Sequence, residues 1–231
     1  MEWRRYRKYV LGSLAVVSVI GLPFFLQHFW SFISGQASSI IIRNRWDIAF
    51  LNIAGFLLFL IPLSFRRKVD WSSLGIYTAF IVSLFIEMYG IPLSVYLTSS
   101  FSGAAAYTPN YILSFSVLGQ TFGMNFWMLL GVLITVIGMF LVAWGWITIY
   151  RTEDELVTSG IYSFSRHPQY LGIMLIASGW FIGWPTLLTT VILPILIYKY
   201  YKLCFKEEKE VMEEIGEEKY RSYRESTPML L

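Results

Sequence analysis

The chain of 231 residues has a single cysteine, Cys204, and two histidines, His28 and His167. One cysteine cannot form an internal disulfide, and two distant histidines without cysteine partners do not make a structural zinc site. Charged residues make up only 14% of the chain, and the formal net charge is +3. The basic residues form short clusters between apolar runs, which argues against nucleic-acid binding. We therefore expect organic chemistry with no metal ion.

Most of the chain consists of hydrophobic residues. The chain is 56% hydrophobic and its mean hydropathy is +0.57, values typical of a membrane protein. A hydrocarbon core about 30 Å thick requires roughly 20 apolar residues as helix. Runs of this length or longer cover approximately 9–32, 46–65, 71–97, 125–150 and 168–204. The run 168–204 is long enough for two spans. The last run is expected to fold back near Gly183-Trp184-Pro185. The sequence thus predicts an all-α polytopic membrane protein with about six transmembrane helices.

The charged loops predict the orientation of these helices. Lys and Arg cluster in segments 4–8 and 66–68, whereas the loop 98–124 has no charge. The positive-inside bias therefore predicts that both termini are cytoplasmic, and only Arg43 and Arg45 disagree with this topology. Because no small-residue cleavage site follows the basic start, we interpret the first apolar run as a retained helix rather than a secretory signal.

An abruptly charged segment, 206–224, follows the last apolar run. Val211, Met212 and Ile215 recur at helical spacing within it, and Gly216 interrupts the pattern. This composition predicts a carboxyl-terminal cytoplasmic amphipathic helix that is broken near Gly216.

The most informative polar segment precedes the fifth span. Pro168 suits the first position of a helix and biases His167 away from helical angles, so we expect His167 to cap that span. A helix amino terminus attracts an anion, and Arg166 adds a fixed positive charge beside it. The alternative is an ordinary membrane-interface anchor, with Arg166 reaching lipid headgroups and Tyr162 and Tyr170 in an aromatic belt.

An acidic pair, Glu207-Glu208, comes directly after the sixth span. Two acids beside a membrane surface gain nothing from anionic lipid. A carboxylate at this position is able to accept two hydrogen bonds from a ribose diol. The alternative is a solvated helix face on which Glu207 pairs with Lys206.

These motifs resemble a known family in order and spacing. Gly160-x-Tyr162, Arg166-His167-Pro168-x-Tyr170-x-Gly172, Glu207-Glu208-x-x-Val211 and Gly216-Glu217-Glu218-x-Tyr220-x-x-Tyr223 are similar to the isoprenylcysteine carboxyl methyltransferase family and its phospholipid-methyltransferase relatives. The likeness covers about a third of the chain, 156–228. It implies a membrane methyltransferase that uses S-adenosylmethionine, with the site on the cytoplasmic side.

The resemblance also implies residue roles. The residues that it assigns to the S-adenosylmethionine pocket are Leu156, Val157, Tyr162, His167, Pro168, Gln169, Tyr170 and Glu207. Region 125–231 would then bind the cofactor. Region 1–124, which contains the first three helices, is the candidate path by which a lipophilic acceptor enters from the bilayer, and membrane lipids surround the protein. The most favoured reaction is carboxyl O-methylation of an isoprenylcysteine-like substrate, and the alternative within the family is N-methylation of a phospholipid headgroup.

The acceptor contacts are less defined. The family has an arginine four residues before the acidic pair, where this chain has Leu203, with Lys202 among the nearest cations. Glu87 is the one acid deep within a span, where insertion of a charge costs about 2.5 to 3.5 kcal/mol, so it is expected to face a cavity or a partner. Arg166, Lys202 and Glu87 are the candidate substrate residues.

Two other classes of protein remain as alternatives. Membrane sterol reductases, which use NADPH, share an Arg-His-Pro-x-Tyr segment, but typically have a glutamate where this chain has Ile173 and an Arg-Asp-Glu run where it has Lys206-Glu207-Glu208. If the protein were a transporter or a structural membrane protein, we would expect polar residues across several spans. The spans contain only Glu87, Asn52 and scattered serines. Both comparisons favour methyl transfer.

Overall fold

The structure is a computed structural model. It describes residues 2–33, 44–64, 70–98, 111–117, 120–152 and 156–230. Arg43 and the basic cluster 66–68, on which the predicted orientation partly depends, lie outside the described residues.

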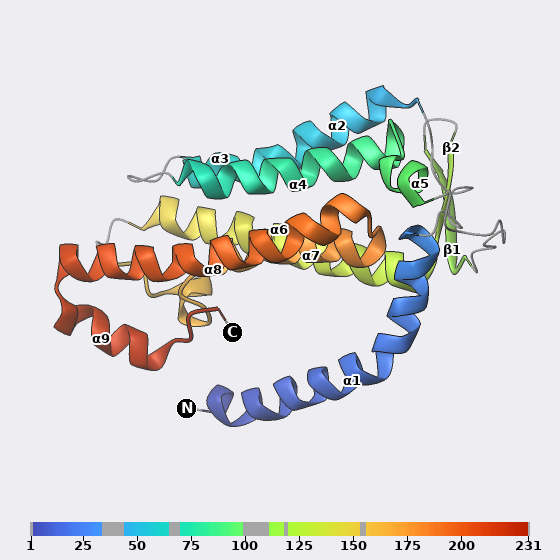
Figure 1. The fold of residues 1–231 in the computed structure, drawn as a ribbon. Helices are drawn as coiled ribbons and strands as arrows, with labels where there is room; N and C mark the ends of the chain where they lie inside the picture. Colours follow the sequence, from blue (N-terminus) through green and yellow to red (C-terminus); the bar gives the residue numbers. More distant parts are fainter. Residues whose placement is uncertain are drawn as a thin grey trace.

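The chain forms a helical bundle with one small β-hairpin (Figure 1). In chain order the elements are α1 (Glu2–Ile33), α2 (Trp46–Leu57), η2 (Leu58–Leu60), α3 (Ile61–Ser64), α4 (Trp71–Tyr89), α5 (Leu93–Thr98), β1 (Leu113–Val117), β2 (Gln120–Met124), α6 (Phe126–Arg151), η3 (Gly160–Ser163), α7 (Pro168–Gly183), α8 (Leu187–Ile215) and α9 (Glu217–Ser226).

The predicted polytopic helical fold is confirmed. Five segments of the described chain are long and apolar enough to cross a bilayer: Ala15–Ile33, Trp46–Ser64, Trp71–Tyr89, Phe126–Arg151 and Leu187–Ile215. The expected sixth span, α7, has 16 residues and is about 24 Å long at the helical rise. It is shorter than the other five and packs along the length of α6.

The predicted turn between the last two long helices is also confirmed. α7 ends at Gly183 and α8 begins at Leu187. Thr186 caps α8, because its hydroxyl accepts from the Thr189 backbone amide at 3.1 Å while the Thr189 hydroxyl accepts from the Thr186 amide at 3.0 Å. The third span is shorter than predicted, since α4 ends at Tyr89 and the next residues before α5 include Pro92.

The uncharged segment 98–124, which the sequence predicts as a loop between two spans, contains the antiparallel pair β1 and β2. Leu113 lies opposite Met124, and Val117 lies opposite Gln120. The residues of β1 alternate between apolar and polar, which is the period of a strand, and both its apolar and its polar described side chains are exposed. A strand of five residues is too short to be detected by a search for apolar runs of membrane-spanning length.

A glycine seam holds α7 against α6. Gly131, Gly138 and Gly145 lie seven residues apart, two turns, on one side of α6. A Cβ on Gly138 would lie 2.6 Å from the carbonyl oxygen of Gly172, and one on Gly145 would lie 2.8 Å from Cγ of Gln169. The two backbones are therefore as close as glycine permits, and this contact fixes where α7 begins.

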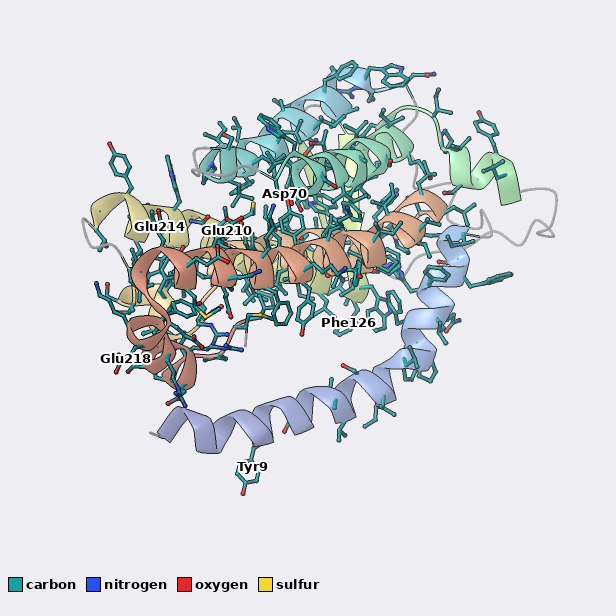
Figure 2. All side chains as sticks on the ribbon, turned by 60° about the vertical axis from the view of Figure 1, so that its left-hand side comes forward. Tyr9, Asp70, Phe126, Glu210, Glu214 and Glu218 are labelled. Atoms are coloured by element: carbon teal, nitrogen blue, oxygen red, sulfur yellow. The ribbon has the colours of Figure 1, made fainter. Side chains whose placement is uncertain are left out.

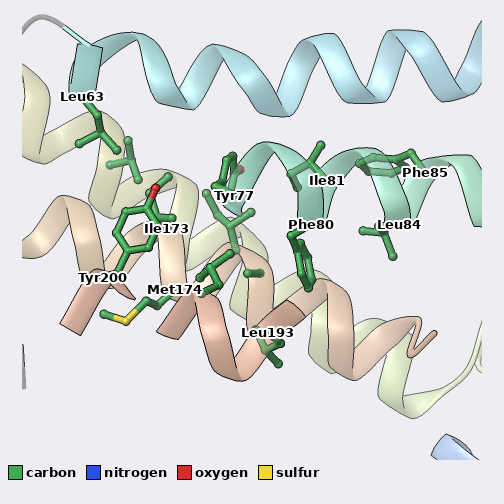
Figure 3. Packing of buried hydrophobic residues seen from close by; sticks show 14 of the residues in the cluster. Leu63, Tyr77, Phe80, Ile81, Leu84, Phe85, Ile173, Met174, Leu193 and Tyr200 are labelled. Carbon is green, nitrogen blue, oxygen red and sulfur yellow. The ribbon is translucent and has the colours of Figure 1, made fainter. Parts of the chain in front are cut away.

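The apolar core lies between α4 and the α7–α8 pair (Figure 3). Tyr77, Phe80 and Leu84 of α4 are fully buried there, as are Ile173 of α7 and Leu196 of α8. In contrast, α1 runs apart from the bundle over its first half and packs on it only near its end (Figure 1). Its many exposed apolar side chains suit contact with lipid.

Figure 1 also places the loops at two ends of the bundle. The segment that joins α6 to α7, the end of α8 and all of α9 lie at one end. The α7–α8 turn, the β-hairpin and α5 lie at the other. The motifs of the carboxyl-terminal third are thus gathered at a single end of the molecule.

Candidate active site

The start of α7 has the predicted form. Pro168 occupies its first turn, and His167 stands at the capping position with φ of −128°. The His167 carbonyl accepts from the Leu171 amide at 3.0 Å, so the helix begins here. No side chain caps this end. The imidazole of His167 is buried and does not cap the helix, so it contacts a different element.

That contact comes from α8. The buried side of this helix runs through Leu193, Leu196, Tyr200, Cys204 and Glu208, at spacings of three and four residues. Glu208 thus ends an otherwise apolar stripe and is 3% exposed. Glu207 lies on the neighbouring side of the helix, and its side chain is 29% exposed.

His167 lies between the two carboxylates. Its Nδ1 is 3.3 Å from Oε2 of Glu207, and its Nε2 is 3.3 Å from Oε1 of Glu208. The ring of Tyr170 stacks on the imidazole, with 5.7 Å between the ring centres and 12° between the planes. The two motifs predicted to cooperate, Arg-His-Pro and the acidic pair, are therefore in direct contact.

The charge state of His167 follows from these neighbours. Burial by itself lowers the pKa of the imidazole, but hydrogen bonds and charges from Glu207 and then Glu208 outweigh burial, and the net result is a pKa raised above its ordinary value. With a carboxylate at each ring nitrogen, both nitrogens act as donors. The raised pKa therefore favours the charged imidazolium form more than in a free histidine.

Arg166 is also buried, and its donors are directed inward. Nη2 lies 2.7 Å and Nε 2.8 Å from Oε1 of Glu208, and the Arg166 side chain is 8% exposed. Nη1 donates to the backbone carbonyls of Arg224, at 3.0 Å, and of Thr227. The alternative in which Arg166 reaches lipid headgroups is therefore wrong.

The carboxyl-terminal segment packs onto the residues before α7. The amides of Arg166 and His167 donate to the carbonyls of Pro228 and Met229, at 3.0 and 3.1 Å. The hydroxyl of Tyr223 in α9 donates to the carbonyl of Tyr162 in η3 at 2.7 Å. The predicted amphipathic helix, broken at Gly216, is therefore present and closes one side of the site.

The remaining residues assigned to the cofactor lie around this cluster. Leu156 and Val157 are half-buried in the segment before η3. Pro168 and Gln169 are buried at the start of α7, and Gln169 lies against Gly145 of α6. The structure thus gathers the assigned residues at one end of the bundle, although Gln169 is directed partly toward α6.

Two of the candidate substrate residues lie elsewhere. Lys202 is on the exposed side of α8, with Nζ 5.0 Å from the centre of the Tyr198 ring. Glu87 accepts from the Ser94 amide at 3.2 Å, and the Ser94 hydroxyl accepts from the amide of Leu187, the first residue of α8. Glu207 is about 30 Å further along this helix at its usual rise. Glu87 therefore lies far from the ionic cluster, at the opposite end of the molecule.

Sequence reasoning named the acidic pair but did not recognise Glu208 as the member shared by Arg166 and His167. Glu208 continues the buried spacing of α8 while Glu207 departs from it, but the sequence alone does not show which side of this largely apolar helix is buried. Tyr223 and its bond to Tyr162 were also missed as part of the site. A tyrosine hydroxyl paired with a distant carbonyl has no signature in the sequence.

The chemistry of this cluster fits S-adenosylmethionine, the cofactor that the resemblance implies. The start of α7, which no side chain caps, suits the carboxylate of an amino-acid moiety, and His167 adds positive charge beside it while its two nitrogens face Glu207 and Glu208. Glu207, partly exposed beside them, offers carboxylate oxygens to a ribose diol. A positive group, His167, and a negative group, Glu207, thus lie side by side, as a nucleoside that carries charges of both signs requires.

Fold and cluster together define the class: an integral, multi-pass α-helical membrane protein with a buried ionic site at one end of its last helix pair. Residues 126–219, from the start of α6 into α9, match the family model described as phospholipid methyltransferase. This match confirms the resemblance for the carboxyl-terminal part of the chain.

A curated relative agrees with this assignment. Protein-S-isoprenylcysteine O-methyltransferase of Schizosaccharomyces pombe is 28% identical over 79 residues, which are 34% of this chain and 34% of the relative. The match thus spans about a third of the relative's length. No solved structure matches the chain.

Proposed function

We propose that this protein is an integral membrane methyltransferase that transfers a methyl group from S-adenosylmethionine to a lipophilic acceptor from the bilayer. The observation that carries the proposal is the contact between His167, at the uncapped start of α7, and Glu207 on α8. It supplies complementary charges for the cofactor inside the region that matches the methyltransferase family.

The bound cofactor supplies an activated methyl group on a sulfonium. The protein's residues bind and orient it: the α7 start and His167 attract the carboxylate, and Glu207 accepts hydrogen bonds from the ribose. Tyr170 holds the imidazole plane by stacking. Because methyl transfer is an in-line displacement, orientation is the main contribution required of the protein.

The acceptor that we favour is a carboxylate, as in an isoprenylcysteine-like substrate. The two carboxylates beside His167 raise its pKa and so favour the imidazolium form, which is a poor proton acceptor. A carboxylate acceptor loses no proton when it is methylated, so it requires no general base. Opposite charges also neutralise each other in this reaction, which a dry site favours.

The second candidate is N-methylation of a phospholipid headgroup, which is supported by the description of the matched family. This reaction releases a proton from an amine, so it requires a proton acceptor. Glu207, partly exposed beside His167, is the group in the described cluster that is best placed for this role.

We further propose that the site faces the cytoplasm, with both termini on the same side. The segment between α6 and α7, the end of α8 and α9 share one end of the bundle (Figure 1). Arg151, Arg166 and the lysines of α8 and α9 belong to that end, as the positive-inside bias requires.

Methyl labelling tests the function and the acceptor together. Membranes that contain the protein are incubated with methyl-labelled S-adenosylmethionine, and the lipid extract is treated with base. Release of label by base indicates a carboxyl ester, and label that resists base indicates a methylated amine. Methyl transfer would be contradicted if membranes with the wild-type protein incorporated no more label than membranes with the Glu207→Gln variant.

A further inference from the structure

The guanidinium of Arg166 joins three elements that are remote in sequence. It belongs to the residues before α7, it forms an ion pair of 2.7 Å with Glu208 of α8, and it donates to carbonyls at the end of α9 and just beyond it. Arg166 thus uses its planar fork to cap α9 and to pair with a buried acid at the same time.

The carboxyl-terminal segment 217–230 has further contacts of its own. Pro228 and Met229 accept from the backbone amides of Arg166 and His167. Thr227 is buried, and Met229 and Leu230 pack against the apolar core. The segment is therefore docked by backbone bonds, apolar burial and one guanidinium, and the backbone bonds and the guanidinium involve the residues that precede α7.

Glu208 transmits this docking to the candidate cofactor residues. A single oxygen, Oε1, lies within 2.8 Å of Arg166 Nε and at 3.3 Å from His167 Nε2. If Arg166 is lost, His167 is the charged partner that remains to Glu208 among the described residues, and the imidazole is drawn toward it and away from Glu207. The position of His167 relative to Glu207 therefore depends on the arginine.

We propose that Arg166 and Glu208 are positioning residues that fasten segment 217–230 to the start of α7 and thereby hold His167 and Glu207 in the arrangement that binds the cofactor. This inference rests on the proposed function, because His167 and Glu207 are taken as the cofactor contacts. Arg166 acts through these residues and through the segment, so cofactor affinity is coupled to docking of the segment.

The experiment uses the full chain in detergent and two measurements. Hydrogen exchange of segment 217–230 is followed without ligand, and binding of S-adenosylhomocysteine is followed by calorimetry. The variants are Arg166→Lys, which keeps the charge and loses the fork, Glu208→Gln, and Tyr223→Phe, which loosens the segment without changing a charge. Arg221→Gln is the matched control, because Arg221 is an exposed arginine of α9 that pairs with Glu225.

We expect faster exchange of the segment in all three variants and unchanged exchange in the Arg221→Gln control. The dissociation constant should rise about tenfold in Arg166→Lys and Glu208→Gln, in keeping with loss of charged hydrogen bonds, and less in Tyr223→Phe. In turnover, KM for the methyl donor should rise while KM for the acceptor is unchanged, which a general loss of structure would not produce.

Two results would overturn the inference. One is unchanged exchange of the segment in Arg166→Lys and Glu208→Gln. The other is faster exchange with undiminished affinity in these variants, or in Tyr223→Phe should the charged variants fail to fold. Failure of the proposed function has a different signature: wild type itself does not bind S-adenosylhomocysteine, whereas the exchange measurement still reports whether Arg166 fastens the segment.

Discussion

Arg166 and Glu208 are 42 positions apart in the chain and form an ion pair of 2.7 Å, with side chains that are only 8% and 4% exposed. A buried pair of this kind contributes little when compared with apolar residues, but removal of one partner leaves an uncompensated charge. The pair connects the residues before α7 to α8, and its neighbours His167 and Glu207 are the proposed cofactor contacts.

Removal of the guanidinium should therefore destabilise the fold. We expect Arg166→Met to lower the free energy of unfolding by about 3 kcal/mol, because Glu208 remains buried with a weaker partner. Thermal or denaturant unfolding in detergent measures the difference. Arg221→Met removes an exposed arginine and should change stability by less than about 0.5 kcal/mol. Equal effects of the two substitutions would contradict the buried-pair account.

The raised pKa of His167 predicts a pH dependence. Charged His167 stabilises the folded state when the pH is below the ordinary value of 6.5, and this contribution is lost as the pH rises through the raised folded-state pKa. The difference in melting temperature between wild type and His167→Gln should thus shrink as the pH rises above about 6.5. A gap that stays constant or widens over this range would show that His167 is neutral in the fold.

The glycine seam predicts a steric effect on the site. Gly138→Ala places a methyl group 2.6 Å from the Gly172 carbonyl oxygen, so α6 and α7 must separate. We expect a loss of about 1 to 3 kcal/mol in stability, measured by thermal unfolding in detergent. Gly55→Ala is the control, because a Cβ there meets nothing within 4 Å. Wild-type stability of Gly138→Ala would mean that the helices are less tightly packed.

Cofactor choice separates methyl transfer from the reductase alternative. We expect S-adenosylhomocysteine to raise the melting temperature of the purified protein and NADPH to leave it unchanged, because ligand binding to the folded state stabilises it. Stabilisation by NADPH alone would favour the reductase, and stabilisation by neither would favour a non-enzymatic membrane protein. His167→Gln should reduce the shift caused by S-adenosylhomocysteine.

The sequence predicted the features that local composition determines. Apolar run length located the membrane helices, and Gly183-Trp184-Pro185 located the reversal between α7 and α8. Proline chemistry placed His167 at the start of α7. Gly216, with φ of 91°, marked the break before α9. These features depend on residues close together in the chain.

The features that were not predicted depend on distant partners. Which member of the acidic pair is buried follows from how α8 rotates against α7, and the direction of the Arg166 side chain follows from where α9 ends. The distance of Glu87 from the site follows from the bundle as a whole. Figure 2 shows how densely side chains fill the space between the helices, and such packing is set by tertiary contacts. The β1–β2 pair and the end of α4 at Tyr89 are local features that were missed.

The most direct test of the account is calorimetric binding of S-adenosylhomocysteine to three forms of the protein in detergent. The account predicts saturable binding to wild type, a dissociation constant at least about tenfold higher for Glu207→Gln, and wild-type affinity for Glu213→Gln, an exposed glutamate on the same helix. Equal affinity of Glu207→Gln and wild type, or no binding by wild type, would contradict it.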